Sequence, residues 1–195
     1  VDVNLRLRVI QHLNFLGSSA GQILLDEENI IKQLPFSLQV AIIENTKLPL
    51  LNKCPLFDSC SEESKRNLCL AFRQQIYSDG DLIIKCGDIG QEMYFLVEGS
   101  VDICNDTGVS FTILQSGSYF GETGLVFSDR RMSNVKAIGI CVCYCLERVY
   151  LDNELKASSE EDAQSAFTSL QKLLASNQKR NAAVSKNLSL AKDKN

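Results

Sequence analysis

The sequence predicts an α+β protein in which short antiparallel strands form a sandwich or rolled barrel with helices on either side in the chain. Between residues 74 and 146, short runs rich in β-branched and aromatic residues are divided by Gly, Asp, Asn and Ser, as is typical of strands joined by tight turns. Before and after this region, apolar residues recur at helical spacing. With 195 residues, 45% of them hydrophobic, the chain can bury a core as one large domain or as a smaller domain with an extension.

Residues 1–53 are expected to form short helices. The first has an apolar face and ends at the GSSAG break of residues 17–21. The second begins with acidic residues, as the helix dipole prefers, and stops before Pro35. The third ends near Thr46, and at most one further turn follows it. This segment is too thin to hold a core alone, so we expect it to pack on the rest of the chain or on other subunits.

The strands are expected to follow one more helix. Ser59 and Glu62 have the spacing of a capping box, which predicts the start of that helix. The expected strands include Ile76 and residues 82–84, 93–97, 101–104, 111–114, 135–138 and 141–146. A helix of one or two turns over residues 122–127 is expected to interrupt the barrel.

Helical character returns after Arg148. Residues 150–157 are expected to form one helix, and Ser158 or Ser159 to cap another. The apolar face of this last helix consists of Ala166, Phe167, Leu170, Leu173 and Leu174. Residues 179–195 are polar and Lys-rich, and we expect a flexible basic tail.

The composition excludes several classes of protein. A formal charge of −4 argues against a general nucleic-acid binder. No apolar run approaches the roughly 20 residues that span a bilayer. None of the eight Cys lies in a CxxC pair and His12 is the only His, so we expect buried free thiols in a reducing cytosol rather than disulfides or a metal site.

One stretch, residues 117–137, has the residue types of an anion site. Gly121 lets the backbone approach a ligand closely, and the first N–H groups of the helix expected after it have no partners inside the helix. Arg131 can close over an anion with its planar fork of donors. Glu122 would repel the anion unless it receives a donor of its own, such as a sugar hydroxyl. Phosphate, ribose and an apolar neighbourhood together indicate a nucleotide.

Catalysis is not expected. The sequence has no recognisable Ser-His-Asp arrangement, metal cluster or P-loop, so no catalytic and no metal-binding residue is predicted, and the protein is predicted not to be an enzyme. The run Arg-Arg-Met-Ser also matches a basic-directed kinase site, but the anion-site interpretation places Ser133 in the site.

The same stretch resembles a known family. The matching pattern is Phe120-Gly121-Glu122, Leu125-Val126, and Arg130-Arg131 two residues before Ser133. It is similar to the phosphate-binding cassette of cyclic nucleotide-binding domains. The upstream glycines Gly80, Gly87, Gly90 and Gly99 also fall where that family turns between strands. Residues 25–43 resemble, more loosely, the C-linker that joins a channel pore to such a domain.

The resemblance implies an antiparallel, jelly-roll-like β-roll with flanking helices, preceded by a small all-α linker. It implies three parts: a C-linker-like segment at 1–53, a cyclic nucleotide-binding domain at 54–178 and the tail at 179–195. The binding residues that it implies are Phe120, Gly121, Glu122, Thr123, Arg131, Met132, Ser133, Leu170, Leu173 and Leu174. The resemblance also implies that Arg131 binds the phosphate, that Glu122 accepts a hydrogen bond from the ribose 2′-hydroxyl, and that the three leucines form a lid over the purine.

The ligand implied is cAMP, with cGMP possible. In channels of the family the residue after the clamp Arg is often Thr, which hydrogen-bonds guanine, whereas Met132 cannot donate. Leu173 and Leu174 have no polar group to read a base edge. The expected preference for cAMP over cGMP therefore depends on Met132.

The implied role is a cytosolic regulatory domain that couples ligand binding to gating of a membrane ion channel. It places the chain at the cytoplasmic face of the plasma membrane, joined to the remainder of a channel or transporter, in a homo-oligomer formed through the helical linker. One alternative is the same role in a sodium/proton exchanger with a voltage sensor. Another is a structural module that binds no ligand, against which the presence of both Glu122 and Arg131 argues.

Overall fold

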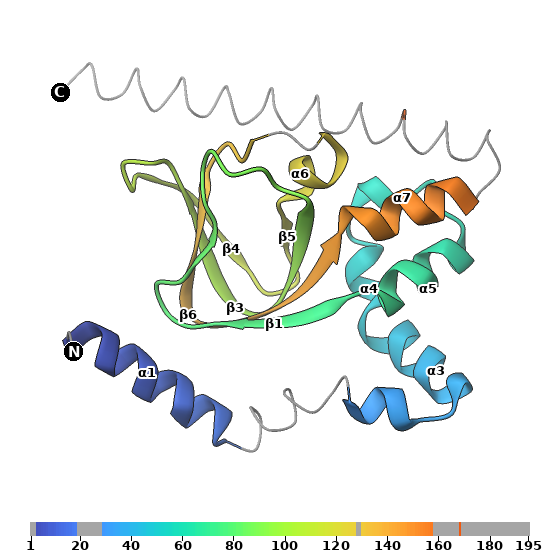
Figure 1. Cartoon of the computed structure of the whole chain (residues 1–195), viewed down its shortest axis with the longest axis horizontal. Helices are drawn as coiled ribbons and strands as arrows, with labels where there is room; N and C mark the ends of the chain where they lie inside the picture. Colours follow the sequence, from blue (N-terminus) through green and yellow to red (C-terminus); the bar gives the residue numbers. More distant parts are fainter. Residues whose placement is uncertain (1–2, 19–28, 128–129, 158–167, 169–195) are drawn as a thin grey trace.

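The computed structural model describes residues 3–18, 29–127, 130–157 and 168. It contains a curled antiparallel sheet with most of its helices gathered at one end (Figure 1). The helices are α1 Val3–Leu16, α3 Phe36–Thr46, α4 Leu48–Leu51, the 3-10 helix η1 Pro55–Phe57, α5 Glu62–Leu70, α6 Glu122–Phe127 and α7 Arg148–Ala157, and residues 29–33 are also helical. The strands are β1 Arg73–Tyr77, β2 Leu82–Ile84, β3 Glu92–Cys104, β4 Ser110–Gln115, β5 Tyr119–Phe120 and β6 Asn134–Glu147. This arrangement confirms the α+β, jelly-roll-like fold.

The sheet is built around two long strands. Its order is β1-β6-β3-β4, with β2 also paired to β6 and β5 to β3. The prediction of four short strands at 93–97, 101–104, 135–138 and 141–146 was wrong, because β3 and β6 each run through a glycine. Gly99 and Gly139 have φ of 91° and 69°, and the register shifts beside them. Such bulges bend a strand without ending it, which lets the two strands curl together.

Two local details also differ from the sequence-based expectation. The cap of α5 is Ser61 rather than Ser59, because the Ser61 side chain accepts from the Ser64 N–H at 3.1 Å. Strand β5 was not predicted, since its two residues are too few to show a period. Its pairing of Tyr94 with Phe120 holds the chain that leads into α6 against β3.

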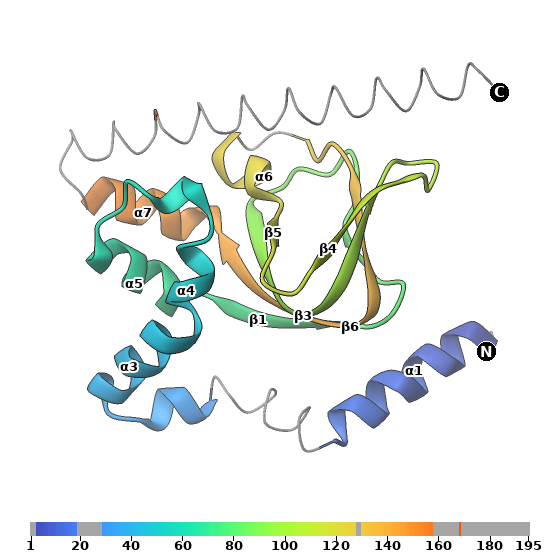
Figure 2. The same cartoon turned by 180° about the vertical axis from the view of Figure 1, so that it is seen from behind.

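The helices at the end of the sheet share one hydrophobic core with it. The buried residues of this core include Ile43 of α3, Leu51 of α4, Phe57 of η1, Leu68 of α5, Phe95 of β3, Leu125 of α6 and Leu151 of α7. Figure 2 shows α3, α4, α5 and α7 as one block beside the sheet. A second core fills the roll and includes Leu96, Phe120 and Val135. Residues 36–51 therefore pack on the rest of the chain, one of the two arrangements expected for a helical segment too small to form a core alone.

Polar contacts also tie the helical block together. Arg66 of α5 contacts Glu44 of α3 with 2.7 Å between Nε and Oε1, and Asn67 donates to Glu154 of α7. Lys47, which is buried between α3 and α4, lies with its Nζ 4.8 Å from the centre of the Tyr144 ring on β6. A buried ammonium is stabilised by such a ring face.

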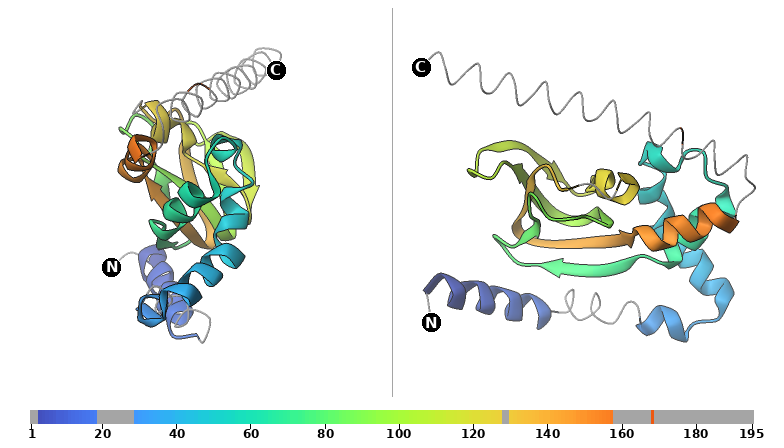
Figure 3. Two further views of the ribbon diagram at one scale, coloured as in Figure 1. Left: turned by 90° about the vertical axis from the view of Figure 1, so that its right-hand side faces the viewer. Right: turned by 45° about the horizontal axis from the view of Figure 1, so that its top comes forward.

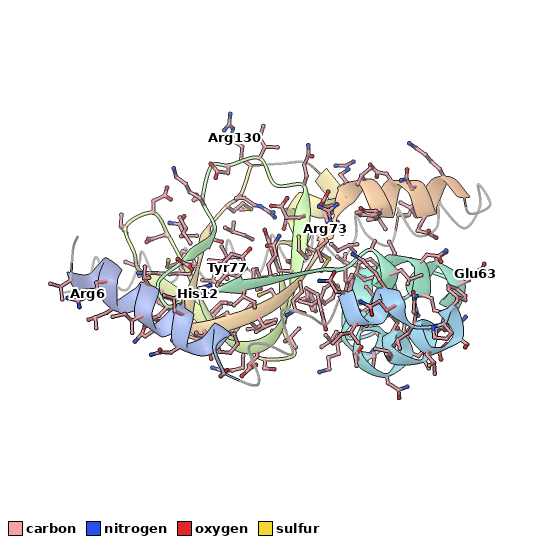
Figure 4. The ribbon with its side chains drawn as sticks, turned by 60° about the horizontal axis from the view of Figure 1, so that its bottom comes forward. Arg6, His12, Glu63, Arg73, Tyr77 and Arg130 are labelled. Carbon is pink, nitrogen blue, oxygen red and sulfur yellow. The ribbon has the colours of Figure 1, made fainter. Side chains whose placement is uncertain are left out.

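Helix α1 lies alongside the β1 side of the sheet (Figure 3). Figure 4 shows His12 of α1 near Tyr77 at the end of β1, and His12 Nδ1 lies 2.9 Å from the Ser78 hydroxyl. Its apolar residues Val3, Leu7, Val9 and Leu13 are exposed. Among the described residues, no helix is both long enough and apolar enough to cross a membrane.

The cysteines behave as small hydrophobic side chains. All eight are free thiols, and six of them are buried. Burial is the main cause that raises the pKa of Cys54, Cys69, Cys143 and Cys145 from 9.0 to about 12. The described residues contain no group of three or more His, Cys, Asp or Glu side chains placed to hold a metal ion.

Candidate functional site

The turn between β5 and α6 is formed as predicted. Gly121 has φ of 80°, a conformation that favours glycine. A Cβ there would lie 3.0 Å from Ile84 Cδ1 and 3.1 Å from Arg131 Nη1, so a side chain would also require these two neighbours to shift slightly. The preceding Phe120 is buried, and its ring stacks on that of Tyr94 at 5.3 Å between centres. The buried Phe120 side chain therefore anchors the residue before the turn to β3.

Helix α6 begins at Glu122, as expected. Glu122 and Thr123 are half-buried at its first turn, whereas Leu125 is buried in the core that the sheet shares with the helical block. The Gly124 N–H donates to the Gly121 carbonyl at 3.2 Å, which closes the turn. The helix is therefore anchored on its core side through Leu125, while Gly124 in its first turn lies against the Arg131 guanidinium.

Arg131 is held in place by its backbone and by its side chain. Its N–H donates to the Asp88 carbonyl and its carbonyl accepts from Gly87 N–H, each at 2.8 Å. Nη1 donates to the Gly121 carbonyl at 2.8 Å, and Nη2 donates to the Glu92 carbonyl at 2.7 Å. The side chain is only 6% exposed. Arg131 is therefore buried beside the turn and not a surface side chain.

Two glycines, Gly90 and Gly124, lie directly against the guanidinium of Arg131. A Cβ on Gly90 would stand 2.0 Å from Arg131 Nε, and one on Gly124 would stand 2.5 Å from Nη1. Side chains at either position would displace the guanidinium. Sequence reasoning predicted a turn at Gly90 but no role for Gly124 at all. The only local signal was the second glycine of the GETG run.

Glu92 is the carboxylate that accompanies Arg131, and sequence reasoning missed it. Its Oε1 lies 3.3 Å from Arg131 Nη2, and the Tyr94 hydroxyl donates to the same oxygen at 3.3 Å. Glu92 precedes Arg131 by 39 residues, and no pattern in the sequence links the two. The strand pairing of β3 brings them together.

The neighbouring residues of Arg131 occupy different environments. Arg130 is exposed and points away from the body of the protein (Figure 4), with Nη1 donating to the Gly87 carbonyl at 2.8 Å. This confirms the prediction that Arg130 faces solvent. Met132 is 61% exposed and Ser133 is half-buried. The lid residues Leu170, Leu173 and Leu174 lie outside the described residues.

The assembled site is a buried cation beside a glycine turn and the start of a helix. Two edges of the guanidinium are engaged by carbonyls, and Arg131 Nε has no hydrogen-bond partner within the described part of the chain. A further acceptor that reaches this fork, such as a phosphate oxygen, would find a donor that is already oriented. The chemistry of the site is anion binding.

Comparison with known proteins agrees with this geometry. Residues 74–158 match the family described as cyclic nucleotide-binding domain. The chain is 35% identical over 167 residues to cyclic nucleotide-gated channel alpha-3 of Homo sapiens, a match that covers 82% of this chain and 23% of that protein. It is 34% identical over 172 residues to a cyclic nucleotide-gated cation channel of Ictalurus punctatus, covering 84% and 24%. It is 31% identical over 167 residues to cyclic nucleotide-gated channel alpha-2 of Bos taurus, covering 82% and 24%.

These matches cover only part of the relatives. The chain spans about a quarter of the length of the proteins to which it is similar. The matched family is a binding domain and the named relatives are channels rather than enzymes.

Proposed function

The chain belongs to the cyclic nucleotide-binding domains of the kind found in cyclic nucleotide-gated channels, and on this premise we propose that Arg131 and the turn at Gly121 bind the cyclic phosphate. The observation that carries the proposal is the orientation of Arg131. Its guanidinium is held against the turn by the Gly121 and Glu92 carbonyls, at 2.8 and 2.7 Å. The bound anion would lie between this fork and the first turn of α6.

Arg131 alone cannot supply the affinity. A hydrogen bond to a charged group contributes about 1.5–3 kcal/mol, whereas micromolar binding corresponds to about −8.2 kcal/mol. The N–H groups at the start of α6 and packing of the purine must supply a comparable amount. Thr123 and Ser133, both half-buried on either side of the arginine loop, are the proposed polar neighbours of the ligand.

Glu122 is proposed to accept a hydrogen bond from the ribose 2′-hydroxyl. It is the first residue of α6 and is half-buried. An acid at this position also suits the helix dipole, so the two roles need separation by experiment. Glu122→Gln should reduce the preference for cAMP over 2′-deoxy-cAMP, whereas a helix-dipole role alone would leave that preference unchanged.

We favour cAMP over cGMP as the ligand. The side chain that follows the phosphate-binding Arg is Met132, which has no hydrogen-bond donor for guanine. Its side chain is 61% exposed, which supports the proposal that it contacts the base. The purine is then recognised through apolar contact, to which the lid residues Leu170, Leu173 and Leu174 are proposed to contribute.

The binding signal is proposed to pass through the core that α6 shares with the helical block. Leu125 of α6 belongs to the same buried cluster as Ile43 of α3 and Leu51 of α4. Because packed cores transmit small shifts between discrete arrangements, a movement of α6 on binding would change how the linker helices pack.

We propose that this change gates a membrane channel at the cytoplasmic face of the plasma membrane, in a homo-oligomer formed through the linker. The exposed apolar residues of α1 suit a contact with another subunit. The sodium/proton exchanger alternative gains no support from the relatives named above, which are channels.

Calorimetric titration of the chain with cAMP and with cGMP tests the proposal. Arg131→Gln should weaken binding by at least a hundredfold, since it removes a charged donor pair and leaves two carbonyls without their partner. Arg130→Gln is the matched control, because its side chain is exposed and points away, and it should change affinity less than threefold. Absence of heat and of thermal stabilisation at millimolar ligand, or equal effects of the two substitutions, would refute the assignment.

A further inference from the structure

Two acidic residues are strand partners at one end of the β3–β6 pair, where Glu92 contacts Arg131. Glu92 of β3 and Glu147 of β6 are direct partners in the antiparallel register. Side chains of such partners lie on the same face, and like charges there destabilise the pair. Each acid has its own arginine. Glu92 contacts Arg131 at 3.3 Å, and Glu147 contacts Arg73 of β1 at 2.7 Å.

The four charges belong to one electrostatic neighbourhood. They surround Cys145, the strand partner of Tyr94 and of Arg73. The pKa of the Cys145 thiol is raised to about 12; burial is the largest cause, the two acids also raise it, and the two arginines lower it. The effects of the two ion pairs therefore meet at Cys145, while each acid keeps a separate arginine as its contact.

Glu92 and an anionic ligand would share one cation. Arg131 is almost fully buried, whereas the side chain of Glu92 is 35% exposed. When a phosphate binds the guanidinium, the positive charge of Arg131 is shared between two anions. Arg131 then stabilises the Glu92 carboxylate less than it does without ligand. Glu92 then has a second anion on its own cation in addition to its strand partner Glu147, in surroundings where charges interact more strongly than in water.

The orientation of Arg131 does not depend on the Glu92 carboxylate alone. The shorter contact, at 2.7 Å, runs from Nη2 to the backbone carbonyl of Glu92, and Nη1 is held by the Gly121 carbonyl. A neutral side chain of the same shape at position 92 would leave both contacts in place. The carboxylate contributes charge more than geometry.

We propose that Glu92 is an affinity-determining residue whose carboxylate competes with the cyclic phosphate for Arg131 and so keeps the affinity for cyclic nucleotides below what the site could reach. This inference rests on the proposed function, because it takes Arg131 as the phosphate-binding side chain.

The test is calorimetric titration of the 195-residue chain with cAMP for four proteins. Glu92→Gln should bind cAMP about tenfold more tightly than the parent chain, a change of about 1.4 kcal/mol. Glu92→Asp keeps the charge and should stay within threefold of the parent. Glu147→Gln is the matched control, with a similar exposed fraction of 37% but its own partner in Arg73, and it should change affinity less than twofold.

The outcomes separate this inference from the proposed function. If the parent chain binds no cyclic nucleotide, the proposed function fails and Glu92 has no ligand to compete with. If the parent binds, but Glu92→Gln binds equally or more weakly, competition is refuted and Glu92 is a structural support of Arg131. Equal tightening by Glu92→Gln and Glu147→Gln would also refute it, because it would show a general effect of net charge.

Discussion

The guanidinium of Arg131 occupies the space that a side chain on Gly90 would need, with Nε only 2.0 Å from the position of that Cβ. The φ angle of Gly90 is not in the left-handed region, so alanine is compatible with the backbone but not with Arg131. Gly90→Ala should therefore displace the guanidinium and weaken cyclic nucleotide binding by at least tenfold. Overpacking of this kind costs about 1–3 kcal/mol. Titration of both proteins with cAMP measures the effect.

Gly87→Ala is the control in the same loop. Gly87 has φ of 86°, and a Cβ there would meet nothing within 4 Å. Its substitution should lower the free energy of unfolding through backbone strain, with a smaller loss of affinity than Gly90→Ala. If Gly87→Ala weakens binding as much, general loosening of the loop rather than displacement of Arg131 explains the result.

Met132→Thr should shift the base preference towards cGMP. The exposed Met132 side chain follows the arginine that we propose binds phosphate, and threonine would add a hydroxyl there. One hydrogen bond contributes about 0.5–1.5 kcal/mol, so cGMP affinity should rise about threefold to tenfold while cAMP affinity changes little. Competition titrations of the two nucleotides measure the ratio. An unchanged ratio would show that the base lies elsewhere.

Leu125→Ala should destabilise the protein and weaken the packing of α6 on helices α3 and α4. Leu125 is fully buried with Ile43 and Leu51, and truncation of such a leucine costs about 2–5 kcal/mol. Urea denaturation measures the change. Leu82→Ala, at a side chain that is 48% exposed on β2, is the control and should cost about 0.5 kcal/mol or less. Similar losses for both would contradict the assignment of Leu125 to the shared core.

The buried thiols predict a loss of stability in alkali. The pKa of Cys54, Cys69, Cys143 and Cys145 is raised from 9.0 to about 12, mainly by burial. Below pH 9 both the folded and the unfolded chain keep these protons, so the thiols make no difference. Above it only the unfolded chain releases them, and the free energy of unfolding should fall by about 1.4 kcal/mol per pH unit for each thiol until pH reaches about 12.

Denaturation under reducing conditions between pH 8 and 10.5 measures this slope. Cys143→Ala removes one titrating group and should reduce the slope by about 1.4 kcal/mol per pH unit, whatever its effect on stability at pH 7. A slope that does not change would mean that residue 143 loses its proton equally in both states.

The candidate site was predictable only where its residues are close in the chain. Gly121, Glu122 and Arg131 lie within one run, and their types and spacing indicated an anion site without any structure. Gly90 and Glu92 belong to the same site but lie about 40 residues before Arg131 in the chain, and Glu92 precedes it by 39. A glycine that supports an arginine and an acid that accompanies it have no signature of their own, because their role depends on which strands pair.

By itself, the sequence determined the α+β class, most of the helices and strands, the turn at Gly121 and the exposure of Arg130, because local propensity and periodicity govern these features. Tertiary structure alone decided that β3 and β6 each continue through a glycine, that β5 exists, and that Arg131 lies buried between Gly90 and the carbonyls of Gly121 and Glu92. The physical reason is that these features depend on contacts between residues far apart in the chain, which form only when the sheet closes.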